Sequence, residues 1–191
     1  MPARASGFNS PFGHMVASLA GAQALIRVIP DYPKVGIQFQ DITPLISDAD
    51  GFAVVTAALS DVDRSAQLIT GIEARGFIFA AAVAAHSHRG FAPIRKAGKL
   101  PHHVHSENYG LEYGTDTLQI HQDAMGFGVQ TLLVDDVLAT GGTMKAALKL
   151  IQRTGGVISS IAVVMELTEL GGRAAIAQEF PNVKITSLFT I

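Results

Sequence analysis

The segment at residues 131–151, TLLVDDVLATGGTMKAALKLI, constrains the fold of this chain more than any other. It opens with the apolar run Leu132-Leu133-Val134, which is typical of a strand buried in a parallel sheet. A loop of small residues follows. From Met144 onward, apolar residues recur at i, i+3, i+4 and i+7, which predicts an amphipathic helix. The order of strand, loop and helix indicates an α/β fold with parallel strands.

Two acids, Asp135 and Asp136, come between the apolar run and the small-residue loop, and we expect them where the strand ends, at the edge where open α/β sheets bind ligands. The loop brings backbone N–H groups and hydroxyls to a helix N-terminus, which suits an anion, and Gly141 and Gly142 let a phosphate approach the backbone. Carboxylates accept hydrogen bonds from sugar hydroxyls. Together these features suit a ribose 5-phosphate. One alternative is an ordinary turn with a glycine pair. A second alternative, a P-loop or a dinucleotide-binding loop, is disfavoured because the motifs G-x-x-x-x-G-K-[ST] and G-x-G-x-x-G are both absent.

Composition is that of an ordinary globular protein. The 191 residues fit one domain, and 48% of them are hydrophobic, enough for a sizeable core. We predict a single domain at residues 15–191. Residues 1–14 carry Pro, Gly, Ser and Asn without a period, which predicts a disordered tail or an added leader.

Charge and cysteine content exclude several classes of function. The net charge of −2 gives no sign of nucleic acid or an anionic membrane as a partner. No apolar run approaches the roughly 20 residues that a membrane-spanning helix needs. Polar residues interrupt the mildly apolar stretch 15–24, which argues against a signal peptide. There is no cysteine, which excludes disulfides and thiolate metal sites, and we predict a cytoplasmic protein.

Further along the chain, the pattern predicts several more elements. A helix ending before Pro30 and Pro33 is expected from residue 15, and residues 32–45 are expected to form a rigid loop. Asp50 is a plausible N-cap for a helix over 52–62. Strands are predicted at 68–72, 91–94, 116–121, 157–167 and 183–188, alternating with helices. This alternation predicts a mostly parallel central sheet flanked by helices.

Several polar groups outside the opening motif admit two interpretations each. Arg75, at a second strand–loop–helix turn, forms either a surface pair with Glu73 or a bidentate contact with a diphosphate. The basic run RKAGK at 95–99 is either a solvated turn or an anion site. The cluster His102, His103 and His105 suggests a metal, but no predicted element aims the three rings at one point.

The string VDDVLATGGT at 134–143 resembles the phosphoribosyl diphosphate (PRPP) motif of the type I phosphoribosyltransferases, V-x-D-D-x-x-x-T-G-G-T. The resemblance implies the fold of that family, an α/β sheet with a small N-terminal hood and a mobile lid loop at about residues 96–110. It implies that Asp135 and Asp136 hold the ribose 2- and 3-hydroxyls. The implied 5-phosphate ligands are Ala139, Thr140, Gly141, Gly142 and Thr143.

Four further segments resemble the adenine phosphoribosyltransferase family: YPKVGIQFQDITPL at 32–45, GIEARGF at 71–77, RKAGKLP at 95–101 and YGLEYG at 109–114. The first implies a base pocket, with Val35 and Gln40 departing from the family pattern. The last implies that Glu112 lies near N7 of the purine, although a lone glutamate there is otherwise read as an exposed strand-end charge. The implied base-pocket residues are Ile37, Phe39 and Gln40, and the implied diphosphate ligands are Arg75, Arg95 and Lys99, with Arg95 acting across a dimer interface.

From residues alone, Ile37 and Phe39 either pack into the core or form an apolar slot for a ring. The resemblance implies the reaction of adenine with PRPP to give AMP and diphosphate in purine salvage, with Mg²⁺ held mainly by PRPP and a homodimer as the assembly. Phosphoribosyl transfer to an oxopurine is the alternative reaction. A PRPP-sensing regulator is the alternative of another class, and it would need a nucleic-acid surface. In the roughly 30 residues before the core only Arg4 and Arg27 are cationic, which argues against a regulator.

Overall fold

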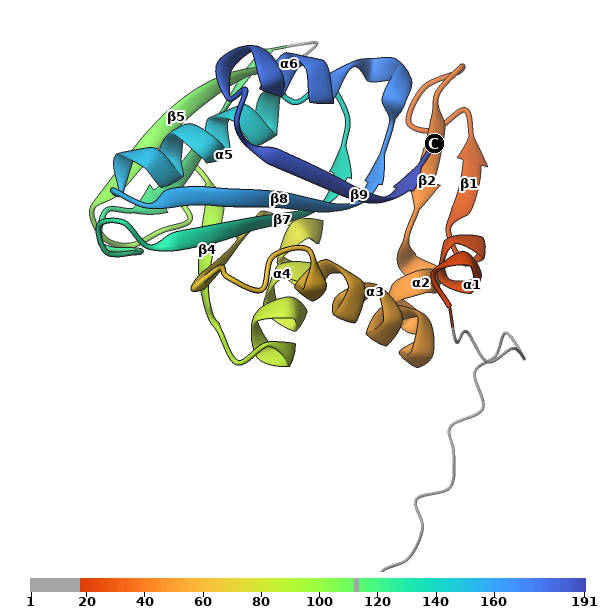
Figure 1. The fold of residues 1–191 in the computed structure, drawn as a ribbon. Coiled ribbons are helices and arrows are strands. Elements are labelled where there is room, and N and C mark those ends of the chain that lie inside the picture. The colour runs from red at the N-terminus through yellow and green to blue at the C-terminus, as the bar shows by residue number, and fades with distance from the viewer. Residues whose placement is uncertain (1–17, 112–113) are drawn as a thin grey trace, which may run out of the picture. The chain divides into compact units, whose positions relative to one another are not determined.

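The computed structural model describes residues 18–111 and 114–191 (Figure 1). The chain forms two compact units, with the boundary between Val55 and Thr56. The predicted tail at 1–14 and the predicted catalytic Glu112 lie outside the described residues. Among the described residues, no helix has both the length and the apolarity needed to cross a bilayer.

The first unit is built around a two-stranded antiparallel sheet. Its elements are α1 (Leu19–Ala24), β1 (Arg27–Pro30), β2 (Gln38–Asp41), α2 (Thr43–Ser47) and the start of α3 (Ala49–Asp61). Two expectations were wrong here. The first helix ends at Ala24, because the chain from Arg27 onward pairs with β2, and residues 32–45 contain a strand and a helix rather than only a loop.

The predicted N-cap of α3 was also wrong. Asp48, two residues before the predicted Asp50, accepts a hydrogen bond from the Gly51 N–H at 2.8 Å. Asp48 is buried, so its carboxylate satisfies a donor of the first helical turn that water cannot reach. Asp50 lies inside the first turn, where an acid still favours the positive end of the helix dipole.

The second unit is an α/β sandwich. Its elements are the remainder of α3, β3 (Leu68–Ile72), α4 (Arg75–His86), β4 (Gly90–Lys96), β5 (Val104–Leu111), β6 (Gly114–His121), β7 (Gln130–Leu138), α5 (Gly142–Arg153), β8 (Val157–Glu166), the short 3₁₀ helix η1 (Thr168–Leu170), α6 (Gly172–Glu179) and β9 (Lys184–Thr190). The seven strands lie in the order β5-β6-β4-β3-β7-β8-β9. Strands β4, β3, β7, β8 and β9 are parallel, which confirms the predicted mostly parallel sheet.

Helices cover both faces of this sheet, with α4 on one face and α5 and α6 on the other (Figure 1). The predicted strand at Leu132, Leu133 and Val134 is fully buried, as a central parallel strand requires. The predicted helical stripe from Met144 to Ile151 is buried as well, so the periodicity read from the sequence is the face that packs on the sheet.

Residues 104–110 of the predicted lid loop belong to β5, the first strand of a β-hairpin. Strand β5 pairs with β6 from Val104 opposite His121 to Leu111 opposite Gly114, and α5 packs along β5. Strand β6 also pairs antiparallel with the end of β4, which joins the hairpin to the main sheet. Cross-strand pairing therefore gives a regular strand to residues 104–110, which the family resemblance places in a loop.

Candidate active site

The loop between β7 and α5 lines a cavity of about 130 Å³. Gly141 has a φ of +85°, a backbone conformation that residues other than glycine rarely adopt. Helix α5 begins at the next residue. The cavity lining includes every predicted 5-phosphate residue, namely Ala139, Thr140, Gly141, Gly142 and Thr143. The free N–H groups and the dipole at the start of this 12-residue helix favour an anion in the cavity.

The predicted ribose ligands lie within β7, and the expectation that they follow the strand was wrong. The strand continues to Leu138 because β8 pairs with it over that length. Asp135 lines the cavity and Asp136 is its buried neighbour, whose N–H donates to Asp135 Oδ1 at 2.9 Å. Burial raises the pKa of Asp135 well above its usual value, and the charge of Asp136 raises it further.

Arg75 brings a positive charge to this acid pair. It is the first residue of α4, and its Nη2 lies 2.8 Å from Asp136 Oδ2. Burial raises the pKa of Asp136, whereas the Arg75 guanidinium lowers it. The approach depends on Gly76, because a Cβ there would lie 2.4 Å from Asp135 Oδ1. The carboxyl ends of the adjacent strands β3 and β7 thus bring Arg75 and both aspartates together.

The basic segment after β4 gathers around Glu73. Arg95 donates to both carboxylate oxygens of Glu73, each at 3.2 Å, and its Nη1 donates to the Lys99 carbonyl at 3.1 Å. The Lys96 N–H donates to the same carboxylate at 3.0 Å. Arg95 and Lys99 therefore meet at the β3–α4 turn, two residues before Arg75. The action of Arg95 across a dimer interface stays a prediction.

Sequence reasoning missed a polar chain that starts on the hairpin. The Tyr109 hydroxyl donates to Asp116 at 3.2 Å, and Lys96 Nζ lies 3.0 Å from the same carboxylate. Burial raises the pKa of Tyr109, while a hydrogen bond from Thr143 lowers it. Thr143 is the last residue of segment 139–143, which is predicted to bind the 5-phosphate and is called the phosphate loop below. The sequence feature that could have indicated this chain is Tyr109, the first residue of the YGLEYG segment, in which only Glu112 was predicted to act.

The predicted base-pocket residues belong to the first unit. Phe39 and Gln40 are partly buried on β2, and the Phe39 ring meets the Tyr32 ring edge-on, with centroids 5.2 Å apart. Ile37 is 43% exposed, which contradicts the alternative that this residue is buried in the core. Val35, one of the two departures from the family pattern, is almost fully exposed at the turn between the strands.

The histidine cluster keeps two of its members together. The rings of His102 and His103 lie 4.7 Å apart, and His102 lies 6.3 Å from the ring of His121 on β6. Within residues 18–111 and 114–191, no group of three or more His, Cys, Asp or Glu side chains is arranged to hold a metal ion.

Comparison with known proteins agrees with this site. The phosphoribosyl transferase domain family matches residues 51–179. Adenine phosphoribosyltransferase of Mycobacterium avium is 49% identical over 173 residues, which are 90% of this chain and 93% of that protein. The corresponding protein of Acidobacterium capsulatum is 47% identical over 87% of this chain and 91% of its own length.

Solved structures agree with the sequence comparison. Adenine phosphoribosyltransferase from Thermoanaerobacter pseudethanolicus superposes with a TM-score of 0.84 at 44% identity, covering 91% of this chain and 99% of that one. The Giardia lamblia enzyme, solved with 9-deazaadenine, has a TM-score of 0.84 at 36% identity and covers 91% and 98%. By its fold, its phosphate loop and these relatives, the chain belongs to the adenine phosphoribosyltransferase family.

Proposed function

We propose that this protein transfers the 5-phosphoribosyl group of PRPP to adenine, giving AMP and diphosphate. The observation that carries the proposal is the cavity of the β7–α5 loop, which adjoins a buried acid pair with Arg75 held against it. Relatives solved with 9-deazaadenine, from Giardia lamblia, and with adenine, from Saccharomyces cerevisiae, support the choice of base.

In this proposal the cavity binds the ribose 5-phosphate half of PRPP. The phosphate accepts hydrogen bonds from the backbone N–H groups at residues 139–143 and from the hydroxyls of Thr140 and Thr143. Asp135, at the cavity wall, and Asp136 accept hydrogen bonds from the ribose 2- and 3-hydroxyls. Burial of both acids excludes water from these contacts, which strengthens them.

The bond from ribose C1 to the diphosphate oxygen breaks as the bond from C1 to the purine forms, and negative charge grows on the departing diphosphate. Arg75, Arg95 and Lys99 stabilise that charge. Arg75 and Arg95 lie at the ends of β3 and β4, and the Lys99 charge acts on Glu73 at the same turn, where it lowers the pKa of that carboxyl. Two carboxylates beside a phosphate cavity fit Mg²⁺, which proteins usually bind through one or two carboxylates and substrate phosphates. When bound, Mg²⁺ neutralises charge on the phosphates.

The purine half of the reaction rests on the family resemblance. Ile37, Phe39 and the backbone at Gln40 hold the base. Glu112 exchanges a proton at N7, as a general acid in one direction and a base in the other, which contributes about 10²–10⁴-fold to the rate. The segment at about residues 96–110 acts as a lid that keeps water from the cationic sugar.

The substrate test is direct. Purified protein is mixed with Mg²⁺ and PRPP, adenine, hypoxanthine, guanine or orotate is added, and the nucleotide product is identified. AMP from adenine alone is expected. PRPP binding without turnover of any base would favour a regulator, and turnover of an oxopurine would mean that the loop carrying Val35 and Gln40 reads a different base.

The role of Glu112 has its own test. Glu112→Gln keeps the shape of the side chain but cannot exchange the proton, so it is expected to retain PRPP affinity and lose most of kcat. Loss of PRPP affinity and kcat to the same extent would contradict that role. The predicted homodimer is measured separately by sedimentation of the intact protein.

A further inference from the structure

The phosphate loop packs backbone to backbone against the first turn of α6. A Cβ at Gly172 would lie 2.2 Å from the Ala139 carbonyl oxygen and 2.9 Å from Leu138 Cδ1. In the other direction, a Cβ at Gly141 would lie 2.9 Å from the Gly172 carbonyl oxygen. Neither contact leaves room for a methyl group. The position of Gly172, which does not line the cavity, therefore constrains the position of the loop.

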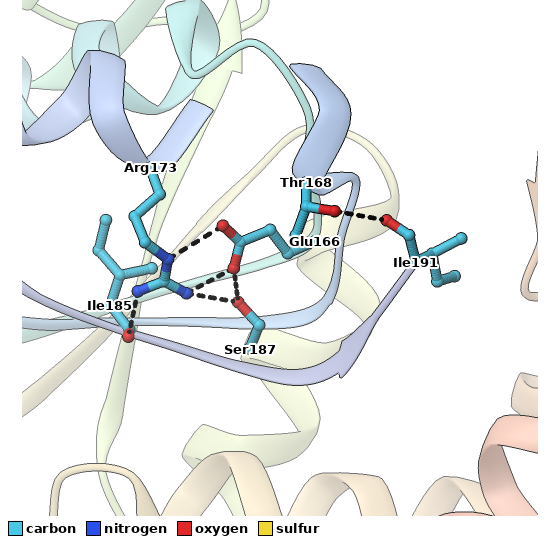
Figure 2. Close-up of polar contacts among 6 residues, drawn as sticks. All are labelled: Glu166, Thr168, Arg173, Ile185, Ser187 and Ile191. Carbon is cyan, nitrogen blue, oxygen red and sulfur yellow. Dashed lines mark hydrogen bonds and ion pairs between the residues drawn. The ribbon is translucent and has the colours of Figure 1, made fainter. Parts of the chain in front are cut away.

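A cluster of polar side chains holds the residue that follows Gly172 (Figure 2). Arg173 donates from Nε to Glu166 Oε1 at 3.0 Å, and its Nη2 also binds the second oxygen of that carboxylate. Its other contacts are with β9, to the Ile185 carbonyl at 2.9 Å and the Ser187 hydroxyl at 3.0 Å. One guanidinium thus ties the start of α6 to the end of β8 and to the first half of β9.

Glu166 links this cluster to the strand that carries the phosphate loop. It is buried at the end of β8, opposite Leu138 of β7, and the next residue, Leu167, donates its N–H to the Leu138 carbonyl at 2.9 Å. The Arg173 guanidinium lowers the pKa of Glu166, and the Ser187 hydroxyl donates to the same carboxylate at 2.5 Å. The contacts are therefore charge-assisted and stronger than neutral hydrogen bonds.

We propose that Glu166, Arg173 and Ser187 form a positioning cluster for the 5-phosphate loop, holding Gly172 against Ala139 and Gly141. None of the three side chains lines the cavity, so they act on the substrate only through the loop. The inference rests on the proposed function, which assigns the 5-phosphate to this loop. The cluster controls affinity for the phosphorylated ribose, and it leaves affinity for diphosphate unchanged.

The test compares Arg173→Met with Arg89→Met as a matched control. Arg89 also uses its guanidinium to bind backbone carbonyls, those of Asp63, Ala66 and Ser60, but none of these residues lines the cavity of the phosphate loop. Ribose 5-phosphate and diphosphate are each titrated into both variants and the parent protein by calorimetry. Arg173→Met is expected to bind ribose 5-phosphate about tenfold more weakly. This is the lower end of the affinity loss seen at metal sites when a residue that orients a ligating side chain is removed, which is a comparable positioning role.

Three further readouts separate positioning from a general loss of structure. The KM for PRPP rises in Arg173→Met while kcat stays within about twofold, because a binding contact is weakened equally in substrate and transition state. Arg173→Lys recovers part of the affinity. Diphosphate affinity and everything measured in Arg89→Met stay at parental values. If Arg173→Met does not fold, Ser187→Ala, which keeps the ion pair, is measured and is expected to show a smaller loss of the same kind.

Parental affinity of Arg173→Met for ribose 5-phosphate, or an equal loss in Arg89→Met, would overturn the positioning cluster. Thr143→Ala distinguishes that result from failure of the proposed function. If Thr143→Ala loses ribose 5-phosphate binding while Arg173→Met does not, only the cluster is wrong. If both keep parental affinity, the loop does not bind the phosphate, and the cluster falls with it.

Discussion

The β7–α5 loop and the β3–α4 loop follow adjacent parallel strands at one edge of the sheet, yet they differ in the interactions that they can offer a phosphate. The β7–α5 loop carries no charged side chain, and its glycine and threonine residues offer backbone N–H groups and hydroxyls. The β3–α4 loop carries Glu73 and leads into Arg75, the first residue of α4, and both side chains have charged partners. The geometry of the β7–α5 loop depends on the close approach of its backbone to neighbouring atoms. The geometry of the β3–α4 turn depends on its charged side chains and their partners.

The steric part of this comparison gives the largest expected effect. Gly141→Ala combines a positive φ with a Cβ 2.9 Å from the Gly172 carbonyl oxygen, and strain of this kind costs about 1–3 kcal/mol before the clash is added. We expect lower stability in urea and loss of ribose 5-phosphate binding. Gly128→Ala is the control, because its φ is +78° but nothing lies within 4 Å of the added methyl group. Equal losses in both variants would show that the contact with Gly172 is unimportant.

Gly76→Ala tests whether the charged loop also has a steric requirement. The added Cβ would lie 2.4 Å from Asp135 Oδ1, so the carboxylate must shift, and overpacking of this kind costs about 1–3 kcal/mol. The KM for PRPP should rise, with a smaller loss of stability than in Gly141→Ala, because φ at Gly76 is not in the left-handed region. In Gly126→Ala, the nearest atom is 3.6 Å from the methyl group, so parental behaviour is expected. A parental KM in Gly76→Ala would place the steric requirement in the β7–α5 loop alone.

Removing a charge at the β3–α4 turn should weaken diphosphate binding more than ribose 5-phosphate binding. In Arg75→Gln, Asp136 loses the cation 2.8 Å from its carboxylate, and the diphosphate loses a ligand. We expect diphosphate affinity to fall about tenfold, or about 1.4 kcal/mol, and ribose 5-phosphate affinity to fall less. Arg153→Gln removes an arginine of similar exposure that pairs with Glu107 at 2.5 Å, and it should leave both affinities unchanged. An equal fall for both ligands in Arg75→Gln would contradict the division of labour between the loops.

The smallest expected effect is on the pH dependence of stability. Burial raises the pKa of Asp135 in the folded protein, so between the usual aspartate pKa and the raised value the folded state binds more protons than the unfolded state. The contribution of Asp135 to stability therefore declines as the pH rises through that window. The asparagine of Asp135→Asn does not titrate, so the variant lacks this pH-dependent contribution to stability, and its side-chain oxygen can still accept the hydrogen bond from the Asp136 N–H. Urea unfolding at pH 4.5 and 7.5 should show the variant gaining stability relative to the parent as pH rises; a constant difference would mean that Asp135 is not perturbed by burial.

The phosphate loop was the most predictable part of the site. Its apolar strand, small residues and helical stripe are contiguous in the chain, so local patterns describe them, and all five predicted loop residues line one cavity. The placement of Asp135 and Asp136 after the strand failed for a physical reason. Two adjacent acids indicate a strand end, but β8 provides pairing partners as far as Leu138, and backbone hydrogen bonds outweigh the local preference.

The first unit was predicted less well for a similar reason. Prolines and a glycine between residues 30 and 45 indicate an irregular loop, yet Arg27 to Pro30 pair with Gln38 to Asp41. Pro30 is compatible with that pairing because it lies at the end of an edge strand, where a missing N–H costs little. A two-stranded pairing across a turn depends on both strands together, and the local sequence of either strand does not predict it.

By itself, the sequence determined the α/β class, the phosphate loop and the family, because each depends on residues that are neighbours along the chain. Tertiary packing decided that Arg75 meets Asp136, that Tyr109 contacts Thr143 as well as its hairpin partner Asp116, and that Gly172 and its neighbour Arg173 lie against the phosphate loop and Glu166. Such contacts join residues up to 61 positions apart, as in the pair of Arg75 and Asp136, and their geometry exists only when several strands end at the same edge of one sheet.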